Sequence, residues 1–294
     1  MAKTFFIVNP IAGGGKAGEL VPIIRQAMAE VEIQYDLAIT RGPGDAVDIA
    51  KRGLGAGYEV LVAVGGDGTI NEVARGILEA DRGRLGILPS GTGNDLARSL
   101  GIDLDPIKAI DTIVNGTVRY IDVGFVNDRI FLNIASIGFD AETVMNTEKI
   151  KKRIRSNIAY VIGVIITLLG FKDKRVELDI DGIKIDGKIT LIAIGNGRYY
   201  GGGLKILPMA IPDDGYFYIC IVNRIARLKL LFLFPTIFKG RHIEIRKYVE
   251  VYRAKTVRVK TIDEAYLNID GEVYDIEGET LFTMNDKKLP IITN

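Results

Sequence analysis

Continuously apolar runs alternate with amphipathic segments through the first 125 residues. The runs "TFFIVNP", "IQYDLAIT", "YEVLVAVG" and "RLGILPSG" predict four strands. Helices are predicted after Lys16, from Gly44 to about Gly53, and over "TINEVARGILEA", "NDLARSLGI" and "PIKAIDTIVNG". Strands that are apolar at every position are covered on both faces, as in a parallel sheet. The alternation therefore predicts an α/β domain with a doubly wound parallel sheet over residues 1–125.

After about Asp122 the pattern changes to an alternation with period two. Runs such as "RVELDIDG", "GYFYICIV" and "YVEVYRAKTVRVKT", separated by glycine turns, predict an antiparallel β-sandwich-like domain over residues 126–280. Two helical stretches interrupt it, at about 141–171 and 226–239. The segment from about 280 to 294, including "TLFTMN", is expected to return to the first domain.

Three predicted strands of the first domain end in glycine-rich turns, "NPIAGGGKAG", "GGDGTINE" and "PSGTGND". In an open α/β sheet, ligands bind at the carboxyl ends of the strands. Glycines let backbone N–H groups approach an anion, and helix N-termini add partial positive charge. One such turn is also explained by turn geometry alone, but three at one edge predict a nucleotide site.

Two familiar nucleotide motifs fit this region poorly. The glycines of "GGGKAG" satisfy G-x-G-x-x-G formally, but the second strand ends in Thr40 where a dinucleotide site needs an acidic residue. This argues against an NAD(P)-binding oxidoreductase. A Walker A loop fails because Lys16 is followed by Ala17 rather than Ser or Thr.

Composition limits the chemistry and the partners. The 294 residues carry a net charge of +1, which gives no general attraction to nucleic acid. Cys220 is the only cysteine and is expected to be buried; His242 is the only histidine and is expected at the surface. A zinc site of His and Cys is thereby excluded, and acid–base chemistry must rest on carboxylates or lysines.

The sequence predicts a cytoplasmic protein with peripheral membrane contact. "MAKTFFIVNP" shows no signal-peptide apolar region, and the uncharged stretch from Ser156 to Phe171 is too short to span a bilayer. Two segments, "KIKKRIRSNIAYVIGVIITLLGFKDKR" and "RIARLKLLFLFPTIFKGR", combine cations with apolar runs. Ordinary core-facing helices would explain them, but together they favour contact with an anionic membrane surface.

The motifs "NPIAGGGK", "GGDGTINEVARG", "LPSGTGNDLAR", "IDVG", "IPDDG" and "NIDGE" occur in this order between Asn9 and Glu272. The set resembles the diacylglycerol kinase catalytic-domain family, which includes bacterial soluble lipid kinases and is similar to sphingosine kinases. "GGDGT" alone is shared with NAD kinases and phosphofructokinases. The resemblance implies an ATP- and Mg²⁺-dependent lipid kinase of phospholipid biosynthesis that phosphorylates the hydroxyl of diacylglycerol or a related alcohol in a cleft between the domains.

By this resemblance, ATP would contact residues of the three loops and their neighbours. They are Asn9, Pro10, Lys16, Thr40, Gly65, Gly66, Asp67, Gly68, Thr69, Asn71, Glu72, Thr92 and Asp95. Other interpretations stay open for three of them. Lys16 would be a solvated lysine at a helix start, Glu72 would favour its helix N-terminus, and Asp95 would be a helix N-cap. Asp67 has no packing role that the sequence suggests.

The resemblance also implies the metal and catalytic residues. Asp67, Asp95 and Asp122 would hold the Mg²⁺ of Mg-ATP, partly through water. Asp270, which from the residues alone is an ordinary turn aspartate, would be the base for the lipid hydroxyl, with Glu272 beside it. A second, structural Mg²⁺ would bind the Asp214 side chain and the carbonyls of Ile211 and Tyr216, or "IPDDG" is a turn without metal.

Two alternatives remain from the sequence. A kinase similar to NAD kinases would act on a soluble acceptor, and a nucleotide-binding regulator would not catalyse at all. The hydrophobic basic segments and "GTGND" argue against the first, and the intact aspartates Asp67, Asp95 and Asp270 argue against the second. The sequence leaves the identity of the lipid and a homodimeric state open.

Overall fold

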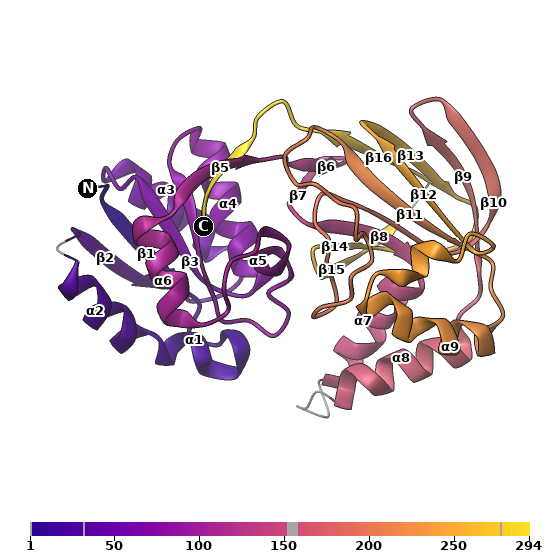
Figure 1. Cartoon of the computed structure of the whole chain (residues 1–294), viewed down its shortest axis with the longest axis horizontal. Helices are drawn as coiled ribbons and strands as arrows, with labels where there is room; N and C mark the ends of the chain where they lie inside the picture. Colours follow the sequence, from indigo (N-terminus) through magenta and orange to yellow (C-terminus); the bar gives the residue numbers. More distant parts are fainter. Residues whose placement is uncertain (1, 32, 152–157, 277) are drawn as a thin grey trace. The chain divides into compact units, whose positions relative to one another are not determined.

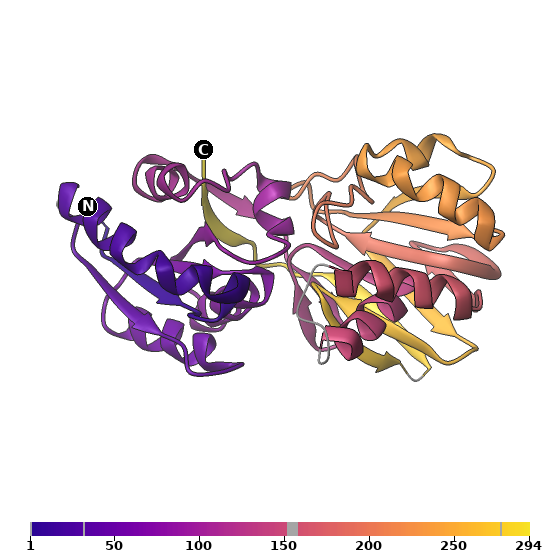
Figure 2. The ribbon, with the colours of Figure 1, turned by 90° about the horizontal axis from the view of Figure 1, so that it is seen from below.

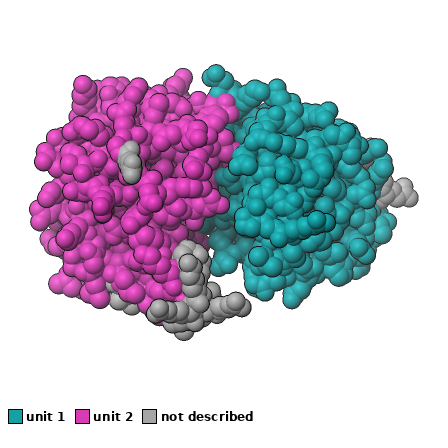
Figure 3. All heavy atoms as spheres, turned by 180° about the vertical axis from the view of Figure 1, so that it is seen from behind, with its two compact units in different colours: residues 1–123, 286–294 teal, residues 124–285 magenta. Residues whose placement is uncertain are grey.

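The structure is a computed structural model that describes residues 2–31, 33–151, 158–276 and 278–294. The chain divides into two compact units, which Figure 3 shows in different colours. Unit 1 comprises Met1–Val123 and Asp286–Asn294, and unit 2 comprises Gly124–Asn285. The roles predicted for the two domains, ATP binding for 1–125 and lipid binding for 126–280, stay predictions.

Unit 1 is built on one sheet, sheet A, with helices on both faces (Figures 1 and 2). Its strands are β1 (Thr4–Val8), β2 (Tyr35–Ile39), β3 (Val60–Gly65), β4 (Arg84–Pro89), β5 (Thr117–Ile121) and β17 (Leu289–Thr293). Its helices are η1 (Ala12–Gly15), α1 (Lys16–Glu19), α2 (Val21–Glu30), α3 (Asp45–Gly55), α4 (Asp67–Ala80), α5 (Asp95–Leu100) and α6 (Pro106–Asn115).

Sheet A has the order β2-β1-β3-β4-β17-β5, and all neighbours are parallel except β17 and β5. Every residue of β3 is buried, as its continuous apolar run predicts. On α4, the predicted face of Ile70, Val73, Ala74 and Ile77 is buried against the sheet side. The predicted doubly wound parallel sheet is confirmed.

The C-terminal return to unit 1 is made by β17 alone. This strand lies between β4 and β5, parallel to the first and antiparallel to the second. The preceding strand, β16 (Glu279–Met284), contains most of "TLFTMN" and stays in unit 2, where it pairs with other strands of that unit. The expectation that "TLFTMN" itself returns was therefore wrong, because its alternating pattern places Phe282 in the core of unit 2.

Unit 2 is an antiparallel sheet, sheet B, which confirms the predicted β-rich second part of the chain. Its strands are β6 (Gly124–Val126), β7 (Arg129–Phe131), β8 (Ile134–Gly138), β9 (Lys174–Ile180), β10 (Ile183–Gly195), β11 (Phe217–Asn223), β12 (Val249–Ala254), β13 (Thr256–Thr261), β14 (Ala265–Ile269), β15 (Glu272–Ile276) and β16. Phe131, Phe217 and Phe282 pack together in its core.

The helices of unit 2 lie together on one side of its strands (Figures 1 and 2). They are α7 (Phe139–Lys151), α8 (Ile158–Gly170), α9 (Arg227–Phe238) and the 3-10 helix η2 (Arg241–Glu244). Pro235 lies inside α9. Among the described residues, no helix has both the length and the apolarity needed to cross a bilayer.

The two residue types that occur once are both buried. Cys220 lies on β11, as expected, and burial raises the pKa of its thiol to about 12. The surface position expected for His242 was wrong. Its Nε2 atom lies 2.9 Å from the Ile206 carbonyl oxygen inside a hydrophobic cluster, and burial lowers its pKa. The alternation of "IEIRKY" after it concealed this tertiary contact.

Candidate active site

The carboxyl ends of four parallel strands are aligned at one edge of sheet A. Val8 at the end of β1 lies in register with Ile39 of β2 and Val64 of β3, and Gly65 lies in register with Pro89 of β4. The strand order reverses between β1 and β3, because β2 lies on one side of this pair and β4 on the other. Such a switch point is where open α/β sheets bind ligands.

A hydrogen bond joins the loops that flank this switch point. The Asn9 side-chain amide donates to the Thr69 hydroxyl at 3.0 Å, and the Asn9 backbone N–H donates to the Val64 carbonyl at 3.0 Å. Thr69 is buried above the end of β3. A Cβ on Gly65 would lie 2.5 Å from the Thr69 hydroxyl oxygen, so only glycine fits at that position.

The three glycine-rich loops pack backbone against backbone. A Cβ on Gly13, whose φ is +61°, would lie 2.0 Å from the Ser90 carbonyl oxygen. A Cβ on Gly91 would lie 2.3 Å from the Gly66 Cα atom. The loops after β1, β3 and β4 therefore contact one another through their backbones at these glycines. Backbone N–H groups of such loops can bind an anion.

Asp67 has a structural role that the sequence did not suggest. Its Oδ2 accepts from the Asp95 backbone N–H at 3.3 Å, and its Oδ1 accepts from the Leu96 N–H at 3.1 Å. From the start of α4, the Asp67 carboxylate thus caps the N-terminus of α5, where N–H groups have no partner within the helix. The glycines around Asp67 let the loop bring its carboxylate to that helix end.

Asp95 is the first residue of α5 and not its N-cap, so the N-cap interpretation of Asp95 was wrong. The N-cap is Asn94, with a left-handed φ of +54° and no side-chain bond to the helix. Its side chain closes the preceding loop instead, accepting from Gly91 N–H at 2.8 Å and donating to Gly91 O at 3.0 Å. Sequence reasoning missed Asn94, although asparagine before a helix in "GTGND" signals this conformation.

Glu72 stabilises a helix N-terminus, but not that of its own helix. Its two carboxylate oxygens accept from the N–H groups of Gly44 at 2.8 Å and Ala46 at 3.1 Å, at the start of α3. It thereby fixes the segment after β2, where Thr40 is buried and its N–H donates to Val8 O at 2.9 Å. ATP contact by Glu72 stays a prediction.

The remaining predicted ATP-contacting residues lie around the same edge. Lys16 and Thr92 are exposed, and Pro10 and Asn71 are half-buried. Lys16 is the first residue of α1 and follows three glycines with positive φ. Both interpretations of Lys16, phosphate contact and solvated helix start, remain compatible with this position.

The residues at the edge fit a Mg²⁺ ion that is held mainly by phosphate and water. The Oδ2 atoms of Asp67 and Asp95 each lie 3.1 Å from the point where a Gly93 Cβ would stand, so two carboxylates face one spot that a side chain would fill. In the described part of the chain, no three His, Cys, Asp or Glu side chains group closely enough to hold a metal alone. Mg²⁺ commonly binds with one or two carboxylates, waters and phosphate oxygens.

The third predicted Mg²⁺ residue, Asp122, is engaged by a cation of the protein. It is buried, and its Oδ1 lies 2.8 Å from the Lys288 ammonium group, which immediately precedes β17. An uncompensated buried carboxylate is unfavourable, so this ion pair gives Asp122 a structural role. Its contact with Mg²⁺ through water stays a prediction.

In unit 2, Asp270 forms the turn between β14 and β15 with its carboxylate directed at backbone. Its Oδ2 accepts from Leu132 N–H at 2.8 Å, and its Oδ1 accepts from the N–H groups of Asn133 and Ile134 at 3.1 and 2.9 Å. Asp270 and Gly271 both have positive φ, as a two-residue hairpin turn requires. The carboxylate is therefore fixed in one orientation.

The predicted neighbour of this base, Glu272, is exposed on β15. Its Oε2 accepts a hydrogen bond from the Tyr274 hydroxyl, and the Arg129 guanidinium lies over the Tyr274 ring at 4.1 Å from its centroid. These contacts hold the Glu272 side chain along the strand surface. A catalytic role for Glu272 stays a prediction.

A buried polar chain behind the Asp270 turn was missed by sequence reasoning. The Ser136 hydroxyl donates to Asp140 Oδ2, the Asn268 amide donates to the Ser136 oxygen at 3.2 Å, and Asn268 Oδ1 accepts from Gly271 N–H at 3.0 Å. Burial raises the pKa of Asp140 to about 6. The only sequence signal is an aspartate directly after the apolar run "IASIGF".

The residues proposed for a second Mg²⁺ already form a closed polar cluster. Asp214 Oδ2 accepts from the Tyr218 hydroxyl at 2.6 Å and from Arg253 at 2.9 Å, and Asp214 Oδ1 accepts from Tyr216 N–H at 3.2 Å. The Arg253 guanidinium also stacks 3.7 Å from the Tyr216 ring centroid. A cation would have to compete with this guanidinium for Asp214, and the second Mg²⁺ stays a prediction.

Comparison with known proteins extends over both units. The profile of the diacylglycerol kinase catalytic domain matches residues 3–126, and that of the YegS C-terminal NAD kinase beta sandwich-like domain matches residues 133–287. A diacylglycerol kinase of Staphylococcus carnosus (strain TM300) is 33% identical over 267 residues, which is 90% of this chain and 87% of that protein.

Solved structures show the same fold. A diacylglycerol kinase from Bacillus anthracis strain Sterne matches with a TM-score of 0.74 at 22% identity, over 100% of this chain and 97% of that chain. An NAD kinase from Archaeoglobus fulgidus in complex with ATP matches with a TM-score of 0.54 at 15% identity, over 99% and 94% of the two chains. The fold is thus shared by kinases with different acceptors.

The family profiles and the relatives together define the class of enzyme, an ATP-using lipid kinase. The chain belongs to the diacylglycerol kinase family.

Proposed function

We propose that the chain transfers the γ-phosphoryl group of Mg-ATP to the hydroxyl of diacylglycerol or a closely related lipid alcohol at a membrane surface. ADP leaves, the lipid hydroxyl loses its proton, and the product is a phosphate monoester that enters phospholipid synthesis. The observation that carries the proposal is the 33% identity to a diacylglycerol kinase, because it covers 90% of the chain, the β-rich half included.

Unit 1 supplies the positioning of ATP that phosphoryl transfer requires. Backbone N–H groups of the loops after β1, β3 and β4 would receive the phosphates, with Asn9 and Thr69 fixing the first two loops relative to each other. Asp67 and Asp95 would hold Mg²⁺, directly or through water. When bound, Mg²⁺ would neutralise charge on the phosphates.

Asp270 would orient the acceptor hydroxyl and take its proton. Three backbone donors hold its carboxylate, so it cannot rotate away from an acceptor. An oriented carboxylate contributes through alignment of the attacking oxygen as much as through proton transfer. Replacing Asp270 should therefore reduce the turnover number without changing the affinity for ATP.

The chain offers a matched control for this replacement. Asp181, in the turn between β9 and β10, also has positive φ and precedes a glycine with positive φ. Its carboxylate accepts from the N–H groups of Lys255 and Thr256 at 2.8 and 2.9 Å. Asp181 thus reproduces the structural role of Asp270 without any predicted catalytic one.

The test measures lipid phosphorylation and ATP affinity for wild type, Asp270→Ala and Asp181→Ala, using γ-labelled ATP and diacylglycerol in mixed micelles. We expect Asp270→Ala to abolish transfer with ATP affinity unchanged, and Asp181→Ala to keep most of the activity. Equal losses in both variants would reduce Asp270 to a turn residue, and a parallel loss of ATP affinity would contradict its role toward the acceptor.

The NAD kinase fold relationship supports one further arm of the same test. In a parallel reaction NAD replaces diacylglycerol as the acceptor. The reason is that residues 133–287 match the profile of an NAD kinase beta sandwich-like domain, and the fold resembles that of an NAD kinase. Label in the lipid extract supports the proposal. Label in NAD would move the chain to a soluble acceptor, and ATP binding without label in either acceptor would favour a regulator.

Membrane contact belongs to this proposal as well. The basic residues Lys152 and Arg153, on which part of the prediction depends, lie outside the described residues. Within the second segment, residues 227–238 form α9.

A further inference from the structure

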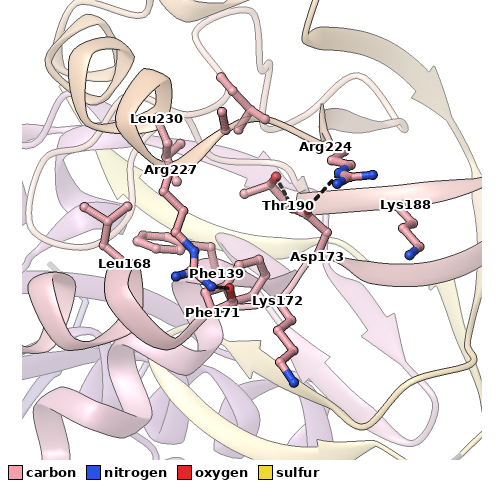
Figure 4. Close-up of a pocket in the computed structure, with 12 residues that line it drawn as sticks. Phe139, Leu168, Phe171, Lys172, Asp173, Lys188, Thr190, Arg224, Arg227 and Leu230 are labelled. Atoms are coloured by element: carbon pink, nitrogen blue, oxygen red, sulfur yellow. Dashed lines mark hydrogen bonds and ion pairs between the residues drawn. The ribbon is translucent and has the colours of Figure 1, made fainter.

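The end of α8 and the start of α9 enclose a pocket of about 550 Å³ in unit 2 (Figure 4). Arg227 at the start of α9 joins the two helices, donating to the carbonyl oxygens of Leu169 and Phe171 at 2.6 and 3.0 Å. The volume is in the range of small-molecule sites. None of the three residues whose backbone N–H groups hold Asp270 lines it.

The lining combines apolar and basic side chains in separate places. Figure 4 shows Leu168 and Leu230 on one side, Phe139 and Phe171 in the middle, and Lys188 and Arg224 on the other side, with Lys172 nearby. We call this site the basic pocket; its full lining is Phe139, Leu168, Phe171, Lys172, Asp173, Lys188, Thr190, Arg224, Ile225, Ala226, Arg227 and Leu230.

The pocket keeps a positive charge despite its carboxylate. Asp173 accepts from the Thr190 hydroxyl at 2.8 Å and lies 3.6 Å from Arg224 Nε, so it is engaged within the wall. The described lining residues include four cationic side chains and one carboxylate, Asp173. The cations are Lys172, Lys188, Arg224 and Arg227. Lys172 and Lys188 are both exposed. An uncharged lipid alcohol gives these ammonium groups nothing to bind, whereas a phosphate does.

Apolar side chains are exposed on both helices beside the pocket. On α9, Leu228 is 74%, Leu231 53% and Phe232 77% exposed, at the i, i+3 and i+4 spacing of one helix face. On α8, Ile166 and Leu169 are 47% and 69% exposed, one turn apart. Grouped exposed apolar residues beside cations are typical of surfaces that enter the boundary of a membrane.

We propose that the basic pocket binds an anionic glycerophospholipid of the bilayer as a second lipid site. The lipid phosphate would lie against Lys172, Lys188 and Arg224, and an acyl chain along the Leu168, Phe171 and Leu230 side. The exposed residues of α8 and α9 enter the bilayer at the same time. The proposal goes beyond the proposed function, since this lipid is held and not phosphorylated.

The test measures binding to vesicles without ATP or acceptor, so its result does not depend on kinase activity. Vesicles of phosphatidylcholine alone are compared with vesicles that also contain phosphatidylglycerol, at low salt. We expect the double variant Lys172→Gln/Lys188→Gln to bind phosphatidylglycerol vesicles about 30-fold more weakly, at about fivefold per lysine near an anionic surface. Binding to phosphatidylcholine alone should change little.

The control variant is Lys184→Gln/Lys255→Gln, which removes the same charge. Both lysines are exposed in unit 2, Lys184 lies on β10 with Lys188, and neither lines the pocket. We expect the control to bind phosphatidylglycerol vesicles like wild type. Equal loss in both variants would mean general charge attraction, and no loss in the pocket variant would overturn the site.

Two further measurements separate the parts of the proposal. Leu228→Ser/Phe232→Ser should weaken binding to both kinds of vesicle, while Ile183→Ser/Ile262→Ser, at exposed apolar positions elsewhere in unit 2, should not. Soluble glycerol 3-phosphate should not displace the protein from phosphatidylglycerol vesicles. Full displacement would show a site for free phosphate esters instead of a bilayer lipid.

Discussion

Asn9 and Thr69, 60 residues apart in the chain, are joined by a 3.0 Å hydrogen bond across the switch point of sheet A. Thr69→Val removes the acceptor and leaves the half-buried Asn9 amide without this partner, at a cost of about 1 kcal/mol. Because the pair sets the distance between two phosphate-facing loops, we expect KM for ATP to rise about tenfold, with kcat changed less. Thr117→Val, at an exposed position of β5, should leave KM unchanged; an equal change in both would remove the pair from the ATP site.

Asp67 has both a capping role and a proposed Mg²⁺ role, and Asp105 has the first role alone. The Asp105 carboxylate accepts from the N–H groups of Ile107 and Lys108 at the start of α6. We expect Asp67→Asn and Asp105→Asn each to lower the free energy of unfolding by less than about 1 kcal/mol, because the Asn side-chain oxygen can still accept from the helix N–H groups. Only Asp67→Asn should lower kcat, by about 100-fold or more. If the two variants lose activity equally, Asp67 is a cap and nothing else.

Asp140 should make stability depend on pH. Burial raises the pKa of this carboxyl from 3.8 to about 6 in the folded protein. The folded state therefore holds the proton more tightly than the unfolded chain, and the stabilisation is present below about pH 4 and is lost as pH rises through about 6. The asparagine side chain of the Asp140→Asn variant does not titrate. As pH rises from about 4 to above 6, the free energy of unfolding of Asp140→Asn should therefore increase by up to about 3 kcal/mol relative to that of wild type. Urea unfolding at a series of pH values measures this, and a constant difference would contradict it.

The Asp214–Arg253 pair predicts how the protein responds to Mg²⁺ in the absence of ATP. The guanidinium already neutralises the carboxylate, so the thermal midpoint of wild type should not rise with Mg²⁺. Arg253→Met removes the competing charge, and its midpoint should rise by a few degrees when Mg²⁺ is added. A rise in wild type that Asp214→Asn abolishes would show that the cation binds beside Arg253 after all.

The arrangement of unit 1 could be predicted from its sequence because local and global signals agree. Continuous apolar runs such as β3 require cover on both faces, and glycines such as Gly65 and Gly13 occur where a Cβ would collide with Thr69 or Ser90. The carboxyl ends of parallel strands lie at one edge of a sheet, so the glycine-rich loops that follow β1, β3 and β4 could be expected to lie close together. This expectation does not depend on any side-chain contact.

Contacts between distant loops could not be predicted in the same way. The partners of Asp67 and Glu72 are backbone N–H groups of other helices, which carry no residue-type signal. His242 was misplaced for a related reason: the Ile206 carbonyl that it meets is 36 positions away. The Asp122–Lys288 ion pair likewise depends on β17 entering sheet A, a register that the apolar pattern alone does not determine.

The position of β17 also constrains the order of events during protein synthesis. A ribosome releases residues from the N-terminus onward, and domains usually begin to fold as they emerge. Sheet A cannot do so completely, because β4 and β5 are joined only through β17, whose residues are translated after those of every other described strand. Unit 2 has all its strands before that point. The second unit of the chain is therefore able to complete its fold co-translationally while the first still waits for its inner strand.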